Sequence, residues 1–160
     1  MKTQIKNKQL ISFFNWASRF LSAPNGLDNA FKKAVQINMK NAEPLVEKYQ
    51  QKQEFLQRDY ATVEPGEEGA LKKVGDKGEL HYSKKSHEKL VAALQDLAEE
   101  TVEVDVAQLS KEASIPKKIK DDYFAMRALN GIVVQKEMAE KILFEFSEEE
   151  PADKEEQKIE

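Results

Sequence analysis

The chain has 160 residues, of which 25 are Lys or Arg and 29 are Asp or Glu, so its formal net charge at pH 7 is −4. With 40% hydrophobic and 34% charged residues, this is the composition of one globular domain and excludes a wholly disordered chain. The lack of cysteine excludes disulfides, thiol nucleophiles and cysteine metal sites. No apolar run approaches the ~20 residues that span a bilayer, and no secretory signal opens the chain, so we expect a soluble cytoplasmic protein without membrane contact.

Charge is distributed unevenly along the chain. Residues 1–60 carry ten basic and five acidic side chains, whereas residues 147–160 carry two basic and seven acidic ones. Because Ile159 is the only large apolar residue of this acidic tail, we expect the tail to be disordered and residues 1–146 to form one domain. The tail is either a solubilising segment or an acidic segment that binds a basic surface. That surface would belong to a partner or to the first third of this chain.

The first apolar pattern has a helical period. Its members are Leu10, Phe13, Phe14, Ala17, Phe20 and Leu21. Their spacing predicts a helix over residues 7–22, which the sequence Pro24-Asn25-Gly26 ends. Because the turn to the next helix is short, we expect the apolar stripes of the two helices to pack against each other. The residues expected to be buried there are Phe14, Ala17, Leu21, Phe31 and Val35.

A second helical pattern runs from residue 27 to residue 60, with Asp28 as the expected N-cap. Pro44 removes a backbone donor and Asn41 could cap a new helix, so we expect a kink or break between Lys40 and Pro44. From residue 47 onward the sequence is mostly polar, which is typical of a helix that projects from its domain or pairs narrowly with another helix.

Residues 62–83 contain four of the six glycines. The segments 71–74 and 79–82 flank a Gly-Asp-Lys-Gly loop, which predicts a small β-hairpin arm. A third helix follows, capped by Ser83 or Ser86 and ending by Thr101. The long helix and the third helix should form an antiparallel, coiled-coil-like hairpin. The expected apolar face of the third helix consists of His87, Leu90, Val91, Leu94 and Leu97.

The rest of the chain predicts one strand and two further helices. Alternating valines over residues 102–106 indicate a half-buried strand. A fourth helix should begin with Pro116 at its first position and stop at Asn130-Gly131. Residues 132–134 are either a strand or a helix start. A last amphipathic helix is indicated by Met138, Ile142, Leu143 and Phe146. The expected fold class is therefore mainly α, with a small β component.

Patterns that would carry catalysis or bind a cofactor are missing from the sequence. His81 and His87 match no metal-ligand spacing. Adjacent acids point apart on a helix, so we expect Glu67/Glu68, Glu99/Glu100 and Asp121/Asp122 to be solvated, the last pair in the first turn of the fourth helix. The sequence has no phosphate-binding glycine loop and no nucleophile elbow. We therefore expect a non-enzymatic protein without a cofactor or metal.

Protein–protein association is the leading functional interpretation. The expected interaction residues form two narrow apolar seams, one on each helix of the hairpin: Tyr49, Phe55, Leu56 and Tyr60, and Leu90, Leu94 and Leu97. A two-helix ribbon leaves apolar edges exposed, which a protein partner or a second copy in a homodimer would cover. The alternative is that the last helix already covers the seam, through Ile142, Leu143 and Phe146.

A nucleic-acid-associated protein is the second interpretation. It rests on the basic residues of the first third, Lys2, Lys6, Lys8, Arg19, Lys32, Lys33 and Lys40. The aromatic residues among them recur at helical spacing on the face expected to point into the core. We therefore expect core packing rather than base stacking for Phe13, Phe14, Trp16, Phe20 and Phe31. The net negative charge of the chain also weakens the case for phosphate contacts.

The order of these elements resembles that of a known group. A long helix opens with residues 31–38 and ends at Tyr60, before a glycine-rich charged arm, a short helix, the strand 102–106 and a helix from Ile115-Pro116 to Leu129. Over residues 27–134 this is similar to uncharacterised small helical proteins encoded by tailed bacteriophages and prophages. The resemblance implies a phage structural, assembly or host-interaction protein, in the host cytoplasm or the virion, and transfers no catalytic residue.

Overall fold

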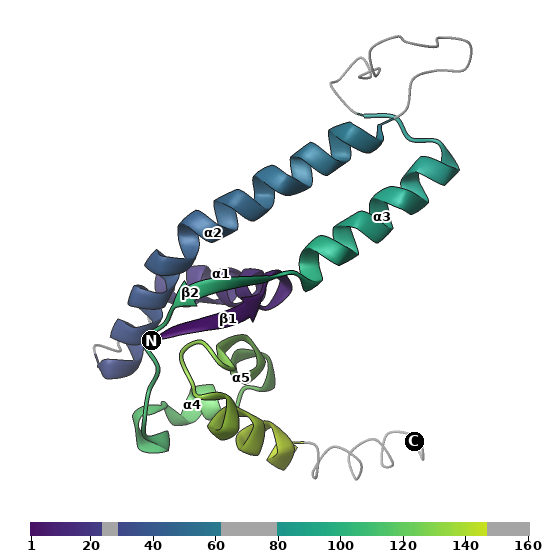
Figure 1. The fold of residues 1–160 in the computed structure, drawn as a ribbon. Helices are drawn as coiled ribbons and strands as arrows, with labels where there is room; N and C mark the ends of the chain where they lie inside the picture. Colours follow the sequence, from purple (N-terminus) through teal and green to yellow (C-terminus); the bar gives the residue numbers. More distant parts are fainter. Residues whose placement is uncertain (24–28, 62–79, 147–160) are drawn as a thin grey trace, which may run out of the picture.

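The computed structural model describes residues 1–23, 29–61 and 80–146. The elements in chain order are β1 (Lys2–Lys6), α1 (Asn7–Ser22), α2 (Ala30–Tyr60), α3 (Lys84–Glu99), β2 (Thr101–Asp105), a 3₁₀ turn (Glu112–Ser114), α4 (Lys117–Lys120) and α5 (Tyr123–Leu129), and residues 136–146 form a last helix. Within these ranges the protein is mainly helical with a small two-stranded antiparallel sheet, which is the expected fold class (Figure 1). Residues 62–79 of the expected arm and the acidic tail 147–160 lie outside the described residues.

The sheet joins the N-terminal strand to the segment that follows α3. Strands β1 and β2 are antiparallel, with Thr3 opposite Val104 and Ile5 opposite Val102. Ile5 and Val104 are buried, and the residues that alternate with them are exposed. The strand over 102–106 was expected, but β1 was not, because Ile5 is its only large apolar residue. The pairing therefore depends on a partner about one hundred residues away in the chain.

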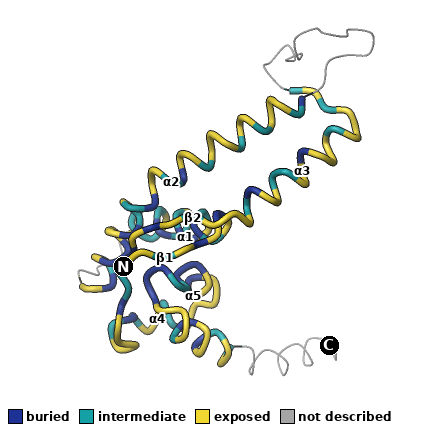
Figure 2. Tube along the Cα trace, in the orientation of Figure 1, coloured by how far each residue is buried: buried dark blue, intermediate teal, exposed yellow. Residues whose placement is uncertain are grey.

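The core lies where the sheet meets α1, the first half of α2 and the C-terminal helices (Figure 2). Ala17, Phe31 and Val35 are buried there, as expected. Phe14 and Leu21 are only half-buried and pack at the core's margin. Since α1 is turned so that Phe13 faces the centre, Phe13 is fully buried instead. The C-terminal contribution to the core comes mainly from Met126, Leu129, Ile132, Val133 and Val134.

Helix α2 is one uninterrupted helix through Pro44, so the expected break is wrong. Ala42 and Val46, on either side of Pro44, are buried, and their packing holds the helix together despite the lost hydrogen bond. In Figure 1 the first part of α2 runs more steeply than the rest, and the kink expected between Lys40 and Pro44 stays a prediction. Asn29, rather than Asp28, is the N-cap, and its side chain accepts a hydrogen bond from the Lys32 amide. Asn41 caps no helix.

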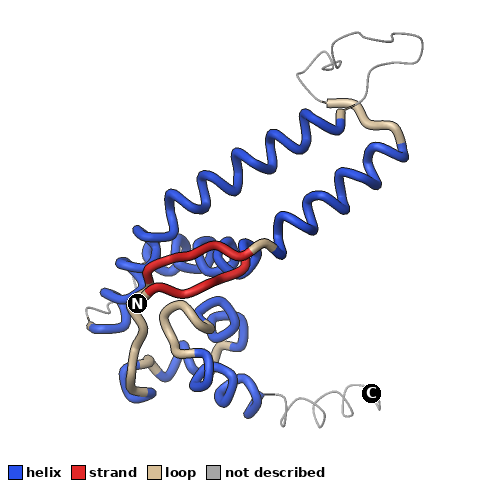
Figure 3. The backbone as a smooth tube through the Cα atoms, viewed as in Figure 1, coloured by secondary structure: helices blue, strands red, loops and turns tan. Residues whose placement is uncertain are grey.

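The second half of α2 and helix α3 run antiparallel and extend beyond the core as a hairpin (Figure 3). Ser83 caps α3, as expected, by accepting a hydrogen bond from the Ser86 amide at 3.2 Å. At the far end of the hairpin, the Tyr82 hydroxyl donates to the Gln57 carbonyl at 2.7 Å and ties the two helices together. His81 and Tyr82, expected in a strand, have no regular secondary structure.

The expected fourth helix is two short helices. Pro116 precedes α4 as its N-cap instead of occupying the first helical position. Asp121 ends α4, and Asp122 caps α5 by accepting from the Ala125 amide, so neither lies within a first helical turn. The stop after Leu129 is confirmed, and Gly131 has a φ of +76°, in the left-handed region that suits glycine. Residues 132 and 133 belong to a buried turn and Val134 forms isolated β-bridges with Leu109 and Asn130, so the segment is neither the regular strand nor the helix start considered above.

Candidate interaction surface on the helical hairpin

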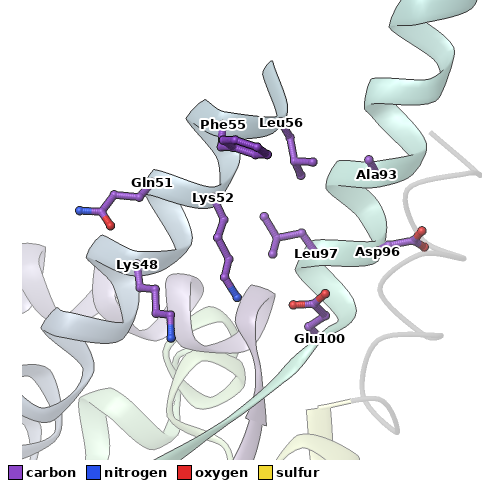
Figure 4. Close-up of a pocket in the computed structure, with 9 residues that line it drawn as sticks. All are labelled: Lys48, Gln51, Lys52, Phe55, Leu56, Ala93, Asp96, Leu97 and Glu100. Atoms are coloured by element: carbon purple, nitrogen blue, oxygen red, sulfur yellow. The ribbon is translucent and has the colours of Figure 1, made fainter. Parts of the chain in front are cut away.

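A groove of about 540 Å³ separates α2 and α3 near the base of the hairpin (Figure 4). We call this groove, together with its two walls, the hairpin surface. The residues that line it from α2 are Lys48, Gln51, Lys52, Phe55 and Leu56; those from α3 and its C-terminal end are Ala93, Asp96, Leu97 and Glu100. Helical periodicity explains the set, because on each wall the residues recur at intervals of three or four.

Three of the seven expected interaction residues come together in this groove: Phe55, Leu56 and Leu97. Phe55 is 68% exposed, although it is one of the largest apolar side chains in the protein. The other four line no part of the groove: Leu90 is buried, and Tyr49, Tyr60 and Leu94 are half-buried along the rest of the hairpin. The expected apolar face of α3 was too wide, because His87 and Val91 are exposed.

The two walls of the groove carry opposite charge, which the apolar periodicity alone did not predict. Lys48 and Lys52 lie on α2, and Asp96 and Glu100 lie on the α3 side. Figure 4 shows Lys52 and Glu100 extending into the space between the helices. Each pair is spaced by four residues, so the spacing that predicted the apolar seam could also have revealed these charged strips. The surface is therefore apolar at its centre, basic on one side and acidic on the other.

The base of the hairpin is fixed to the core by hydrogen bonds from the start of α1. The Asn7 side chain donates to the Leu97 carbonyl and the Asn7 amide donates to the Glu100 carbonyl, each at 2.9 Å. Next to them, Lys6 donates to Glu99 at 2.7 Å and Lys8 bonds to the second oxygen of the same carboxylate. The hydrogen bonds from Lys6 and then Lys8 lower the pKa of Glu99 from 4.5 to about 2.

The last helix does not cover the hairpin surface. Its Ile142 is buried in the core, and its Phe146 packs edge-on against Tyr123, with ring centroids 5.7 Å apart. In Figure 1 this helix lies on the opposite side of the sheet from the hairpin. Within the described residues, Phe55 is therefore left exposed to solvent at the groove, while Leu56 is half-buried and Leu97 is buried.

The basic residues of the first third are dispersed over several elements. Lys2 pairs with Glu103 at 3.6 Å on the exposed face of the sheet, and Lys6 pairs with Glu99. Lys32, Lys33 and Lys40 belong to α2. Lys8 and Arg19 both line a groove between α1 and α5, and Lys6 and Lys8 both line another groove beside β1. Of the aromatic residues expected in the core, Phe13 and Phe31 are fully buried, whereas Trp16 and Phe20 are half-buried and line the groove between α1 and α5.

Among residues 1–23, 29–61 and 80–146, no cluster of three or more His, Asp or Glu side chains could hold a metal ion. The His87 ring instead packs edge-on against Tyr82, with centroids 6.3 Å apart. In the same ranges, none of the helices has the length and apolar character needed to cross a bilayer.

These features define a mainly helical protein with a projecting antiparallel hairpin. Comparison of the chain with protein-family models, with curated proteins and with solved structures found no match. The similarity to small phage proteins, which was based on the order of elements, therefore stays a prediction.

Proposed function

We propose that this protein is non-enzymatic and acts by protein–protein association through the hairpin surface, with a second copy of the chain as the occupant. The observation that carries the proposal is the exposure of Phe55 in a groove that it shares with the half-buried Leu56 and the buried Leu97. Isolated exposed apolar residues are common on protein surfaces. Here the aromatic ring adjoins further apolar side chains on a projecting element, which is the arrangement of an interface anchor.

Charge complementarity supports a second copy as the partner. In a two-fold symmetric pair, each surface contacts the same surface of the other copy. Two hairpins packed in this way would place Lys48 and Lys52 of one copy against Asp96 and Glu100 of the other, and the reverse contact would occur by symmetry. The two Phe55 rings would enter the grooves at the centre, and the four helices would form a bundle. We further propose, from the order of elements alone, that the assembly serves a phage structural, assembly or host-interaction role.

Light scattering during gel filtration tests this proposal. At high micromolar concentration we expect a molar mass of twice 18.3 kDa for the wild-type chain. Replacing Phe55 and Leu56 by Ser should give a folded protein of half that mass. Phe144→Ser is the matched control, because Phe144 is 62% exposed but belongs to the last helix, away from the hairpin. A monomeric wild-type chain at that concentration would overturn the proposal.

A further inference from the structure

The groove between α1 and α5 is a second candidate site, separate from the hairpin surface. Its volume is about 950 Å³, at the upper end of the ~300–1,000 Å³ typical of ligand pockets. Three aromatic residues (Trp16, Phe20, Phe124) and three basic ones (Lys8, Arg19, Arg127) contribute to its lining. We call this groove, defined by these six residues, the aromatic–basic groove. It shares no lining residue with the hairpin surface, so the two can be tested independently.

The aromatic residues present ring surface on both walls of this groove. On α1, the rings of Trp16 and Phe20 are stacked, with centroids 4.9 Å apart and an interplanar angle of 11°. Both also contact the buried Phe31 edge-on, at 6.4 and 5.7 Å, so the core holds them in place while they remain half-exposed at the groove. On α5, Phe124 is 76% exposed. A flat group in the groove would therefore meet one rigid aromatic wall and one accessible ring.

The charged residues make this groove basic, although the whole chain is acidic. Lys8, Arg19 and Arg127 outnumber one carboxylate, Asp122, whose Oδ1 already accepts a hydrogen bond from the Ala125 amide. The Arg127 guanidinium lies over the Tyr123 ring, 5.7 Å from its centroid, which orients it without neutralising its charge. Lys8 is paired with Glu99, so Arg19 and Arg127 are the stronger candidates for an anionic ligand.

We propose that the aromatic–basic groove binds single-stranded nucleic acid. Unpaired bases would stack on Phe124 and pack against the half-exposed Trp16–Phe20 pair, and Arg19 and Arg127 would contact the phosphates. Stacking on aromatic side chains combined with basic residues along the backbone is the usual chemistry of single-strand binding. Duplex DNA fits less well, because its bases are stacked internally and the groove presents no helix that could enter a major groove.

The position of Trp16 provides a direct measurement, because it is the only tryptophan in the chain. Titration with oligothymidylate of about 12 nucleotides, within the usual site sizes for such proteins, should quench Trp16 fluorescence to saturation. Because Arg19 and Arg127 are the two cations expected to contact phosphates, log K should fall with log salt with a slope of about −1.4, from roughly −0.7 per neutralised phosphate on a single strand. A duplex of equal length should bind at least tenfold more weakly.

Substitutions at exposed positions separate stacking from charge. Arg19→Gln and Arg127→Gln should each weaken binding and make the slope shallower by about 0.7. Phe124→Ala should weaken binding about 5- to 150-fold at every salt concentration and leave the slope unchanged, as expected from about 1–3 kcal/mol of stacking per base. Phe144→Ala, on the last helix, is the control. Far-ultraviolet circular dichroism should show that all four variants keep the wild-type fold.

Two results would overturn the proposal. One is the absence of both fluorescence quenching and anisotropy change with labelled oligothymidylate at about 50 mM salt, where electrostatic binding is strong. The other is equal binding of inorganic polyphosphate together with no effect of Phe124→Ala, because the groove would then bind charge alone. Neither result bears on association through the hairpin surface, which light scattering measures.

Discussion

Asn7 joins the first helix to the end of the third: its side-chain amide donates a hydrogen bond to the Leu97 carbonyl at 2.9 Å, in a buried environment. Asn7 is only 3% exposed, although it is polar. Because Leu97 also lines the hairpin surface, this bond sets the position of the surface relative to the core. A single buried amide therefore couples the stability of the domain to the geometry of the candidate interface.

Replacing Asn7 by Ala should destabilise the protein by about 0.5–1.5 kcal/mol, because the Leu97 carbonyl would lose the shorter of its two hydrogen bonds and keep only the one from the Glu100 amide at 3.2 Å. Urea denaturation measures this loss. Asn15→Ala is the matched control, since Asn15 is exposed on the same helix, and it should change the free energy of unfolding by less than about 0.5 kcal/mol. Equal effects of the two substitutions would contradict the role assigned to Asn7.

Phe13 is fully buried, whereas its neighbour Phe14 is half-buried. Phe13→Ala should therefore cost about 3–5 kcal/mol of unfolding free energy, from lost apolar burial plus a cavity. Phe14→Ala should cost about 1–2 kcal/mol, in proportion to the smaller area that it removes from contact. Thermal or urea melts of the two variants would show which face of α1 points into the core. A larger loss for Phe14→Ala would reverse the assigned orientation.

Glu99 should make stability depend on pH in the acidic range. Its pKa is lowered from 4.5 to about 2 in the folded protein, so the stabilisation is fully present above pH 4.5 and is lost as the pH falls toward 2. Glu99→Gln cannot titrate. The difference in unfolding free energy between wild type and this variant should therefore be largest above pH 4.5 and shrink toward pH 2.

The Glu99 carboxyl group can also be titrated directly by NMR. Its midpoint should lie near 2 in the wild-type protein and move up toward 4.5 in Lys6→Gln and in Lys8→Gln, because each variant removes one hydrogen-bond donor. A wild-type midpoint near 4.5 would show that the two lysines do not hold this carboxylate in solution.

Charge reversal on one wall of the groove tests the proposed two-fold packing. A variant with Lys48→Glu and Lys52→Glu should be monomeric in light scattering, because like charges would face each other across the interface. A second variant with Asp96→Lys and Glu100→Lys should be monomeric for the same reason.

Mixing these two variants provides the decisive measurement. In the mixed pair, each reversed wall would meet a wall of opposite charge, so a heterodimer should form and its mass should return to that of the wild-type dimer. If the mixture stays monomeric while wild type dimerises, the two copies do not pack wall against wall as proposed.

Local signals in the sequence determined the helices. The bounds 7–22 of α1 were predicted because its apolar stripe and its terminating Pro-Asn-Gly sequence act over a few residues. The Ser83 cap and the stop at Asn130-Gly131 were predicted for the same reason. At Asp122 two such signals conflict. The apolar residues on either side of it have the spacing of one continuous helix, whereas its side chain caps the start of a new helix.

Only the tertiary structure decided which segments meet. Strand β1 has too little apolar character to be predicted alone, and it exists because Thr3 and Ile5 pair with valines about one hundred residues later. Packing of Ala42 and Val46 kept α2 intact through Pro44, against the local cost of proline. The pairing of Lys48 and Lys52 with an acidic wall, and of Trp16 and Phe20 with Arg127, likewise joins residues distant in sequence. Periodicity reports the faces of one helix, whereas a site depends on which faces the fold brings together.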